Sequence, residues 1–181
     1  MSGRYKILFN YGSIAGLVAF AWAVLIYLFG FSPLGVATFS EFWIPILIVF
    51  LSIKANAKAA LPENGYPFSR AFFDGITTGI LTGLLKGMLL FVFMKVLASD
   101  IPDQYYAEQE RLIAFLERNS QGQNIANIEQ LKAAIEQDKK VGFGGYRVVF
   151  GEINKYFYFA IPFSILAAFI YKKPFVKNDN Q

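Results

Sequence analysis

The sequence predicts an all-α membrane protein with four transmembrane helices, and three observations lead to that fold class. Hydrophobic residues make up 55% of the 181-residue chain and charged residues 17%, whereas soluble domains carry about 25% charged residues. Four apolar segments approach or exceed the length that crosses a bilayer. A polar segment with helical periodicity, residues 100–141, separates the last two. We expect one integral membrane domain over residues 1–181, with an extramembrane amphipathic helical hairpin between helices 3 and 4.

The first expected span covers residues 7–29. Arg4 and Lys6 precede it, as in a secretory signal peptide, and Ala21-Trp22-Ala23 has the pattern of a cleavage site. The apolar run nevertheless continues to Phe31, which is too long for the apolar core of a signal peptide. We therefore expect an uncleaved first transmembrane helix.

The second expected span, residues 41–61, is less uniform. Its strongly apolar part, residues 42–53, is too short to cross a bilayer alone. Continuing to residue 61 gives a full crossing, because Lys54 and Lys58 can extend their ammonium groups to the membrane surface. A re-entrant segment is the alternative. Asn-Gly and two prolines within residues 61–67 predict a turn.

The third expected span, residues 71–97, has glycine at every fourth position. This stripe consists of Gly75, Gly79, Gly83 and Gly87. On a helix such a glycine zipper lets two backbones approach closely, which stabilises helix pairs in lipid. Gly12 and Gly16 form a similar pair on the first span. The stripe packs either against another helix of the same chain or against another subunit, and both interpretations stay open.

A second stripe on the same span is polar and has the same spacing. It consists of Asp74, Thr78, Thr82 and Lys86. This stripe should turn away from lipid, because a charge that faces hydrocarbon is expensive. Asp74 lies near the start of the span, where an acidic residue suits the positive end of a helix in the headgroup region. Lys86 lies near mid-membrane and needs a counter-charge, a water-filled cavity or loss of its proton.

Two amphipathic helices, about residues 103–118 and 125–139, form the expected hairpin. Asn119-Ser120-Gln121-Gly122 breaks the pattern between them. The hairpin is too small for a core of its own, so it lies on the membrane surface, on the ends of the bundle or on a partner. The fourth expected span, residues 148–171, carries small residues at positions 160, 164 and 168.

The fourth span supplies possible partners for Lys86. Glu152 is the best counter-charge and Asn154 a neutral acceptor, although the expected depths of Lys86 and Glu152 differ by about 10 Å. Three interpretations remain: a structural ion pair between helices 3 and 4, a functional site that binds an anionic lipid headgroup or relays a proton, or neutralisation of Lys86 by a partner's acid. Glu152 could instead pair with Lys155, three residues away.

The composition excludes several kinds of chemistry. The chain has no cysteine and no histidine, which rules out disulfides, thiolate nucleophiles, His general bases and zinc sites. We expect no catalytic residues, no cofactor and no metal. Gly142-Phe143-Gly144-Gly145 is not a phosphate loop, because no strand precedes it and no Lys-Ser/Thr follows. The net charge of +4 favours lipid headgroups over nucleic acid.

Basic residues in the short connecting segments predict the orientation. They fall near the start of the first span, between the second and third spans and after the fourth: Arg4, Lys6, Lys54, Lys58, Arg70, Lys172, Lys173 and Lys177. The segment between the first two spans has none. The positive-inside rule therefore predicts cytoplasmic termini and a hairpin outside.

Three motifs follow one another from residue 65 onward. Gly65-Tyr66-Pro67-Phe68-Ser69-Arg70-Ala71-Phe72 leads into the glycine-rich span, Ile101-Pro102-Asp103 precedes a Glu/Gln-rich helical segment, and the last span ends in Tyr171-Lys172-Lys173. The chain resembles an uncharacterised family of small four-span bacterial inner-membrane proteins, a domain of unknown function common in Bacteroidota. The resemblance implies a fold and an inner-membrane location, but no activity and no catalytic residues.

Two functions fit these observations. The first is a non-enzymatic subunit or scaffold whose glycine-stripe helix and hairpin engage other membrane proteins or a second copy. The second is a small transporter, or a binder of anionic lipid or solute, that uses Lys86 and Glu152 inside the membrane.

Overall fold

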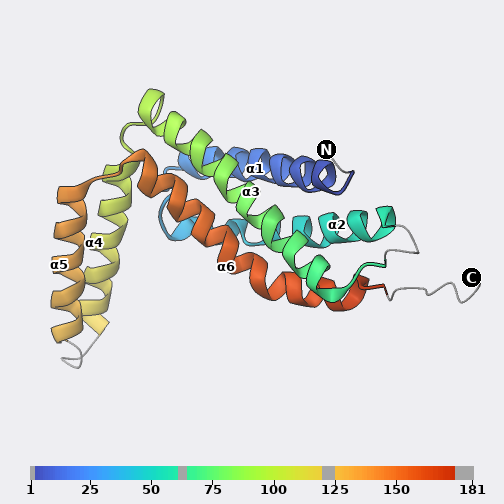
Figure 1. Ribbon diagram of the computed structural model, residues 1–181. Helices are drawn as coiled ribbons and strands as arrows, with labels where there is room; N and C mark the ends of the chain where they lie inside the picture. The colour runs from blue at the N-terminus through green and yellow to red at the C-terminus, as the bar shows by residue number, and fades with distance from the viewer. Residues whose placement is uncertain (1–2, 61–64, 120–124, 174–181) are drawn as a thin grey trace, which may run out of the picture.

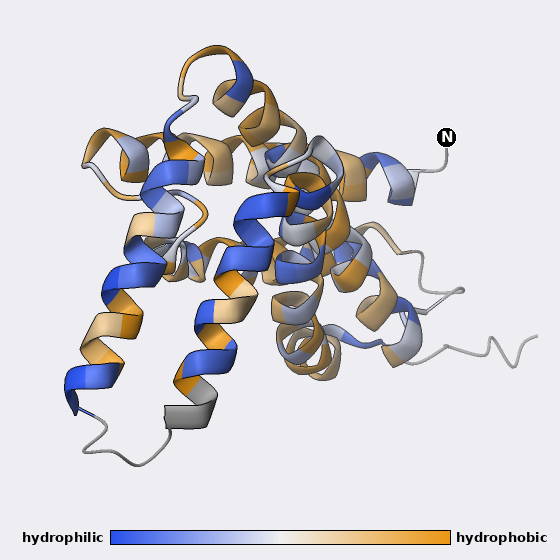
Figure 2. Cartoon of the chain, turned by 90° about the vertical axis from the view of Figure 1, so that its left-hand side faces the viewer, coloured by the Kyte–Doolittle hydropathy of each residue, from blue (hydrophilic) through white to orange (hydrophobic). Residues whose placement is uncertain are grey.

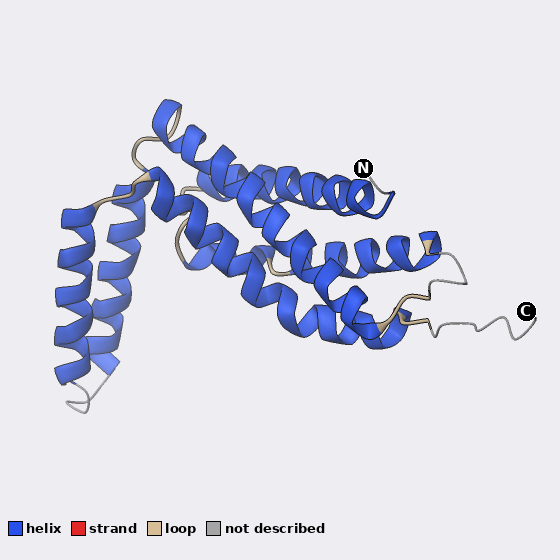
Figure 3. Ribbon diagram, in the orientation of Figure 1, coloured by secondary structure: helices blue, strands red, loops and turns tan. Residues whose placement is uncertain are grey.

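The computed structural model describes residues 3–60, 65–119 and 125–173, and these form six α-helices and one short 3₁₀ helix. No β-sheet forms within the described ranges, and Figure 3 draws them as helices joined by short loops. The predicted all-α class is therefore confirmed.

Four long apolar helical segments can cross a membrane. They are α1 (Gly3–Leu28), η1 with α2 (Val36–Glu41 and Trp43–Ala59), α3 (Phe68–Val96) and α6 (Gly145–Tyr171). Because η1 continues into α2, the second segment reaches 24 residues, enough for a full crossing. Many large apolar side chains on the outside of these helices are exposed, as expected for contact with lipid. The chain is a multi-pass membrane protein.

The observed helices are close to the expected spans but begin earlier. The helix α3 starts at Phe68 and α6 at Gly145, three residues before the predicted starts at 71 and 148. Of the expected turn over residues 61–67, the structure describes residues 65–67, where Gly65 has φ of +53°. Of the expected break at 119–122, it describes only Asn119, the last residue of a helix, and Lys177 lies outside the described residues.

The bundle is built around α3 and α6, which pack against each other along most of their length (Figure 1). At one end, α2, α3 and α6 share an apolar core that includes Ile53, Ile76 and Ala167. At the other end, a second core contains Leu90 and Val148, and a third cluster joins α1 to α2.

Two short connections fix the ends of the bundle. Tyr66 and Lys173 exchange backbone hydrogen bonds of 2.9 and 2.8 Å, which tie the start of α3 to the end of α6. At the other end, Gly142 ends the fifth helix with φ of +67°, a conformation that favours glycine.

The helical hairpin consists of α4 (Ile101–Asn119) and α5 (Ile125–Val141), and its long axis runs across the direction of the spans (Figure 1). Figure 2 looks at the hairpin end of the bundle, where the distal halves of both helices extend clear of the spans. The first turns of α4 contact the bundle: Ile101 is buried in the apolar core there, and Glu108 accepts a 2.7 Å hydrogen bond from the backbone N–H of Ser32.

Candidate functional site: a buried charge cluster

Four charged side chains meet inside the bundle, and we call them the charge cluster: Glu41, Lys86, Glu152 and Lys155. Lys86 Nζ lies 2.6 Å from Glu41 Oε1 and 2.8 Å from Glu152 Oε2. Lys155 pairs with the same Glu41 oxygen and lies 2.8 Å from Glu152 Oε2. Each lysine therefore contacts both carboxylates, and the cluster is neutral overall.

Three separate elements position the cluster. Glu41 is the last residue of η1, Lys86 lies on α3, and Glu152 and Lys155 lie one turn apart on α6. The predicted depth difference between Lys86 and Glu152 was too large. Lys86 lies ten residues before the end of α3 and Glu152 seven residues after the start of α6. In an antiparallel pair this offset of three residues amounts to about 5 Å, which a lysine side chain spans.

The cluster is enclosed on most sides. The Lys86 side chain is 0% exposed, and both glutamates are buried, whereas the Lys155 side chain keeps 20% of its surface exposed. The buried Tyr156 ring lies beneath both ammonium groups, 5.7 Å from Lys86 Nζ and 5.6 Å from Lys155 Nζ. Within the described part of the chain, Glu41 Oε2 and the Tyr156 hydroxyl have no hydrogen-bond partner.

A pocket of about 270 Å³ leads from the hairpin end of the bundle to the cluster. Glu152 and Lys155 form part of its wall, together with Thr38, Arg147 and Tyr105. Burial raises the pKa of the Tyr105 phenol, so this hydroxyl remains a hydrogen-bond donor at neutral pH. Arg147 pairs with Asp138 of α5. The pocket thus presents two cationic groups and one carboxylate to a solute.

A buried polar file continues from the cluster toward the other end of α3. Thr82 and Thr78 each donate a 2.8 Å hydrogen bond to the backbone carbonyl four residues earlier, and Thr78 also contacts Ser52 of α2 at 2.8 Å. The file ends at Asp74, which is 0% exposed. The predicted polar stripe therefore does turn into the bundle.

Asp74 accepts hydrogen bonds from two residues that were not predicted as its partners. Arg4 Nε donates to Asp74 Oδ1 at 2.8 Å, and the Tyr66 hydroxyl donates to Asp74 Oδ2 at 2.7 Å. Asp74 lies near the start of α3, as expected, but it is enclosed by protein groups. It belongs to a separate ion pair and is not part of the charge cluster.

The glycine stripe contacts α6 of the same chain. A Cβ atom added to Gly83 would lie 2.6 Å from the Glu152 carbonyl oxygen, and one at Gly87 would lie 2.8 Å from Val149 Cα. Gly79 faces Ala160 and Gly75 faces Ser164. Because α6 contacts all four glycines, the structure supports the interpretation that this stripe packs within one chain, while contact with another subunit stays a prediction.

Gly12 and Gly16 lie on a different contact. Added Cβ atoms there would meet Leu81 and Leu85, so α1 packs on the leucine side of α3 and not on the glycine stripe. Asn154 is exposed on α6, because a two-residue step from Glu152 turns it to the opposite side of the helix. Asn154 is therefore not an acceptor for Lys86, contrary to the prediction.

Sequence analysis missed Glu41. It is the first acidic residue in the chain, and apart from Ser40 its neighbours are apolar: Phe39 before it and Phe42-Trp43-Ile44-Pro45 after it. An unpaired carboxylate at the edge of an apolar span has a high free-energy cost. The isolated position of Glu41 could therefore have identified it as a residue with a buried partner.

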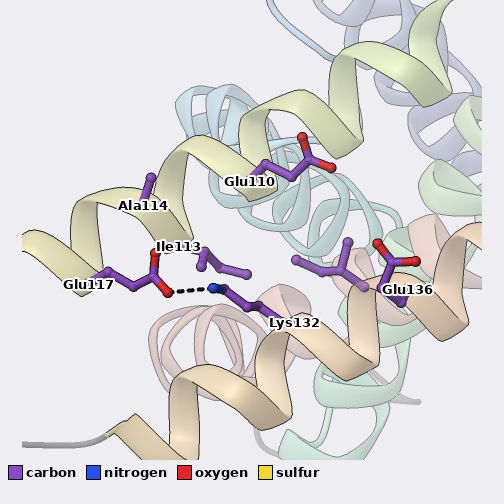
Figure 4. Close-up of a pocket in the computed structure, with 7 residues that line it drawn as sticks. Glu110, Ile113, Ala114, Glu117, Lys132 and Glu136 are labelled. Carbon is purple, nitrogen blue, oxygen red and sulfur yellow. Dashed lines mark ion pairs between the residues drawn. The ribbon is translucent and has the colours of Figure 1, made fainter.

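The hairpin contains a second pocket, shown in Figure 4 between α4 and α5. Ile113 and Ile135 contribute to its lining, and Glu117 pairs with Lys132 at 2.5 Å across it. Its charged groups are exposed to water, unlike the buried groups of the charge cluster. Among the described residues, no group of three or more acidic side chains is arranged to hold a metal ion.

Comparison with known proteins places the chain in a family without an assigned activity. The model of the family described as "Protein of unknown function (DUF4199)" matches residues 10–173, nearly the whole chain. Neither the curated proteins nor the solved structures contain a match. The chain therefore belongs to the DUF4199 family of proteins of unknown function.

Proposed function

We propose that this multi-pass membrane protein binds a small anionic solute in the pocket in front of the charge cluster. The observation that carries the proposal is the placement of Lys155 and Glu152, which belong both to the pocket wall and to the buried cluster. A solute that enters the pocket can therefore reach charges that are otherwise sealed inside the bundle.

Electrostatics favours an anion in this pocket. Arg147 and Lys155 supply two cationic groups there, and Glu152 is already engaged by Lys86 and Lys155. An incoming carboxylate or phosphate can replace a glutamate oxygen at Lys155, with Arg147 as a second cation in the pocket wall. The cavity of about 270 Å³ lies just below the range for drug-sized ligands, so the solute is small.

The energetic cost of the cluster supports a functional role. Buried ion pairs commonly contribute little net stability, and apolar residues of similar volume often replace them without loss. Ionisable residues within transmembrane segments therefore mark binding sites and ion pathways by default. We propose a non-enzymatic role, because the groups gathered here are suited to binding charge.

Transport is the second candidate, and the buried polar file favours it. Ser52, Thr78 and Thr82 continue the polar lining from Lys86 to Asp74 near the opposite end of the bundle. A solute or a proton that leaves the cluster in that direction would meet hydroxyl groups along α3.

We further propose a bacterial inner-membrane location with both termini in the cytoplasm, because the Lys and Arg residues of the short connecting segments lie on one side.

A role as a subunit or scaffold is the competing proposal. It would mainly use surfaces other than the glycine stripe, since α6 contacts all four of those glycines. The lipid-facing sides of α1 and α2 remain for such contacts, either with another protein or with a second copy.

The test uses the purified protein in detergent and two probes, inorganic phosphate and acetate. We expect one of them to raise the thermal unfolding temperature above that in chloride at equal ionic strength. Arg147→Gln and Lys155→Gln should abolish the increase, and Arg147→Gln should leave the fold intact because this side chain lies at the rim of the pocket. Lys95→Gln is the matched control, an exposed lysine outside the pocket. Stabilisation by neither probe, or stabilisation that survives both pocket variants, would rule out the proposal.

Labelled phosphate and proteoliposomes separate binding from transport. Uptake that Arg147→Gln abolishes and Lys95→Gln preserves would support a transporter. Binding without uptake would identify the site as a receptor for its solute.

A further inference from the structure

The helix α4 carries an apolar surface that the described residues leave largely uncovered. Phe115 is 61% exposed, and Leu112 and Leu116 are 43% and 38% exposed. These three residues are spaced for one side of the helix, so they form a continuous patch, which we call the α4 patch. An exposed patch of this kind marks an interaction surface.

The α4 patch lies on the same helix face that docks on the bundle. Ile101 is buried at the bundle end, and Glu108 accepts the hydrogen bond from Ser32. Residues 101, 105, 108, 112, 115 and 116 are separated by three- and four-residue steps, apart from the last pair, and so face one direction. The face that contacts the end of the bundle therefore continues into the α4 patch.

The orientation of the hairpin directs the α4 patch toward the membrane. The four spans fix the bilayer around the bundle, and α4 runs across their direction (Figure 1). Phe115 lies two helical turns beyond Glu108, about 10 Å further along the axis. The distal half of α4 extends clear of the spans (Figure 2). The part of this helix face near Glu108 contacts the bundle, and the part near Phe115, beyond the edge of the bundle, faces lipid.

The opposite side of α4 is already occupied. Ile113 is buried, α5 contributes the buried Ile128, and Lys139 pairs with Glu110 across the two helices. The helix α5 lies on the side of α4 away from the spans (Figure 1). One face of α4 therefore packs against α5, and the α4 patch lies on another face that the described residues leave largely uncovered.

Two arginines border the α4 patch on one side. Arg111 and Arg118 are exposed and seven residues apart, so they project on the same side of the helix, next to Phe115. Apolar side chains bordered by basic ones are the pattern of helices that lie in a membrane interface and contact anionic headgroups.

We propose that α4 rests on the lipid bilayer at the hairpin end of the bundle, with the α4 patch in the headgroup–acyl boundary and Arg111 and Arg118 at lipid phosphates. The partner of this surface is an anionic lipid membrane and not a second protein. The inference is independent of what the pocket binds.

The chain has no cysteine, so a single introduced cysteine can carry a fluorescent label. Phe115→Cys reports on the α4 patch. The matched control is Ala133→Cys, an exposed position on the polar side of α5. Both full-length variants are placed in nanodiscs of phosphatidylcholine and phosphatidylglycerol and quenched with either a lipid-borne nitroxide or iodide in the water.

We expect the lipid-borne quencher to be several-fold more effective at position 115 than at 133, and iodide to show the reverse. Arg111→Gln with Arg118→Gln should weaken lipid quenching at position 115 in these nanodiscs, with no such change in pure phosphatidylcholine. Equal iodide quenching at both positions would overturn the proposal. Protection of position 115 from both quenchers would also overturn it, because a protein would then cover the α4 patch.

Discussion

At the scale of single residues, Lys86 is the centre of the charge cluster. Its ammonium group contacts two carboxylates from different elements and has no exposed surface. Lys155 contacts the same carboxylates but opens to the pocket. The two lysines therefore differ in role: Lys86 balances the buried acids, and Lys155 is the cation that a solute can reach.

Lys86→Met should strongly destabilise the protein. The substitution leaves Glu41 and Glu152 facing a single lysine inside the bundle, and removal of one partner from a buried ion pair costs about 3–5 kcal/mol. The free energy of unfolding in mixed detergent micelles measures the effect. The control Lys95→Met removes an exposed lysine from the same helix and should change stability by less than about 0.5 kcal/mol.

A second substitution tests whether unbalanced charge causes the loss of stability in Lys86→Met. Lys86→Met combined with Glu152→Gln leaves Glu41 paired with Lys155, so the double variant should recover much of the loss. If the double variant is no more stable than Lys86→Met alone, the loss comes from packing and not from unbalanced charge.

Tyr66→Phe should destabilise the other buried ion pair. The Tyr66 hydroxyl donates to Asp74, and its loss leaves a buried carboxylate oxygen with one fewer donor, at a cost of about 1–3 kcal/mol. Tyr5→Phe is the control at an exposed tyrosine. Similar unfolding free energies for the two variants would contradict this prediction.

Tyr66 should also make the stability of the protein depend on pH. Burial, followed by the hydrogen bond to Asp74, raises the pKa of Tyr66 above the ordinary value of about 10. A raised pKa in the folded state contributes stability that is fully present below about pH 10 and is lost as the pH rises further, because only the unfolded state then releases the proton. Tyr66→Phe should flatten this alkaline decline relative to the parent protein, as measured by unfolding at several pH values.

At the scale of elements, the seam between α3 and α6 holds the bundle together. The glycines of α3 allow the α6 backbone to approach, and the small residues Ala160 and Ser164 of α6 face them. This close approach also brings Glu152 within reach of Lys86. The packing of the seam and the geometry of the charge cluster therefore depend on each other.

Gly83→Ala should disturb this seam. The new methyl group would meet the Glu152 carbonyl oxygen at 2.6 Å and the Ile153 Cα at 2.8 Å, and backbone atoms cannot move aside as a flexible side chain can. Overpacking of this kind costs about 1–3 kcal/mol. Gly151→Ala on α6 is the matched control, because a Cβ there meets nothing within 4 Å and should be neutral or stabilise by up to about 1 kcal/mol. Unfolding in detergent compares the two, and equal stability would argue against a tight seam.

Hydropathy predicted the elements well, because spans and amphipathic helices have clear sequence periods. The cost of a buried charge pointed to Glu152 as the best partner of Lys86, and the two side chains do pair. The same argument did not reach Glu41, since its contact with Lys86 depends on how η1 packs against α3. Asn154 was predicted wrongly. It is close to Glu152 in sequence, but residues two positions apart on a helix lie on opposite sides. The partner of the glycine stripe was left open, because small residues occur on three helices and spacing alone does not choose among them.

At the scale of the whole molecule, the protein has one polar axis inside an apolar bundle. The axis runs from the pocket at the hairpin end, through the charge cluster and the hydroxyls of α3, to Asp74 near the other end. Its two ends differ, because one has the pocket with Arg147 and the other has an ion pair with Arg4. The side of the membrane that the hairpin faces therefore decides from which compartment a solute enters.

The distribution of basic residues predicts that the hairpin faces away from the cytoplasm. Lys54, Lys58 and Arg70 lie at the end of the bundle opposite the hairpin, near Arg4, and the positive-inside rule assigns that end to the cytoplasm. Cells that express Ala133→Cys should react with a membrane-impermeant maleimide once the outer envelope is opened. Lys58→Cys should react only after the membrane is dissolved in detergent, and it is the internal control. The reverse labelling pattern would show that the pocket takes its solute from the cytoplasm, and the solute would then be sought among cytoplasmic anions.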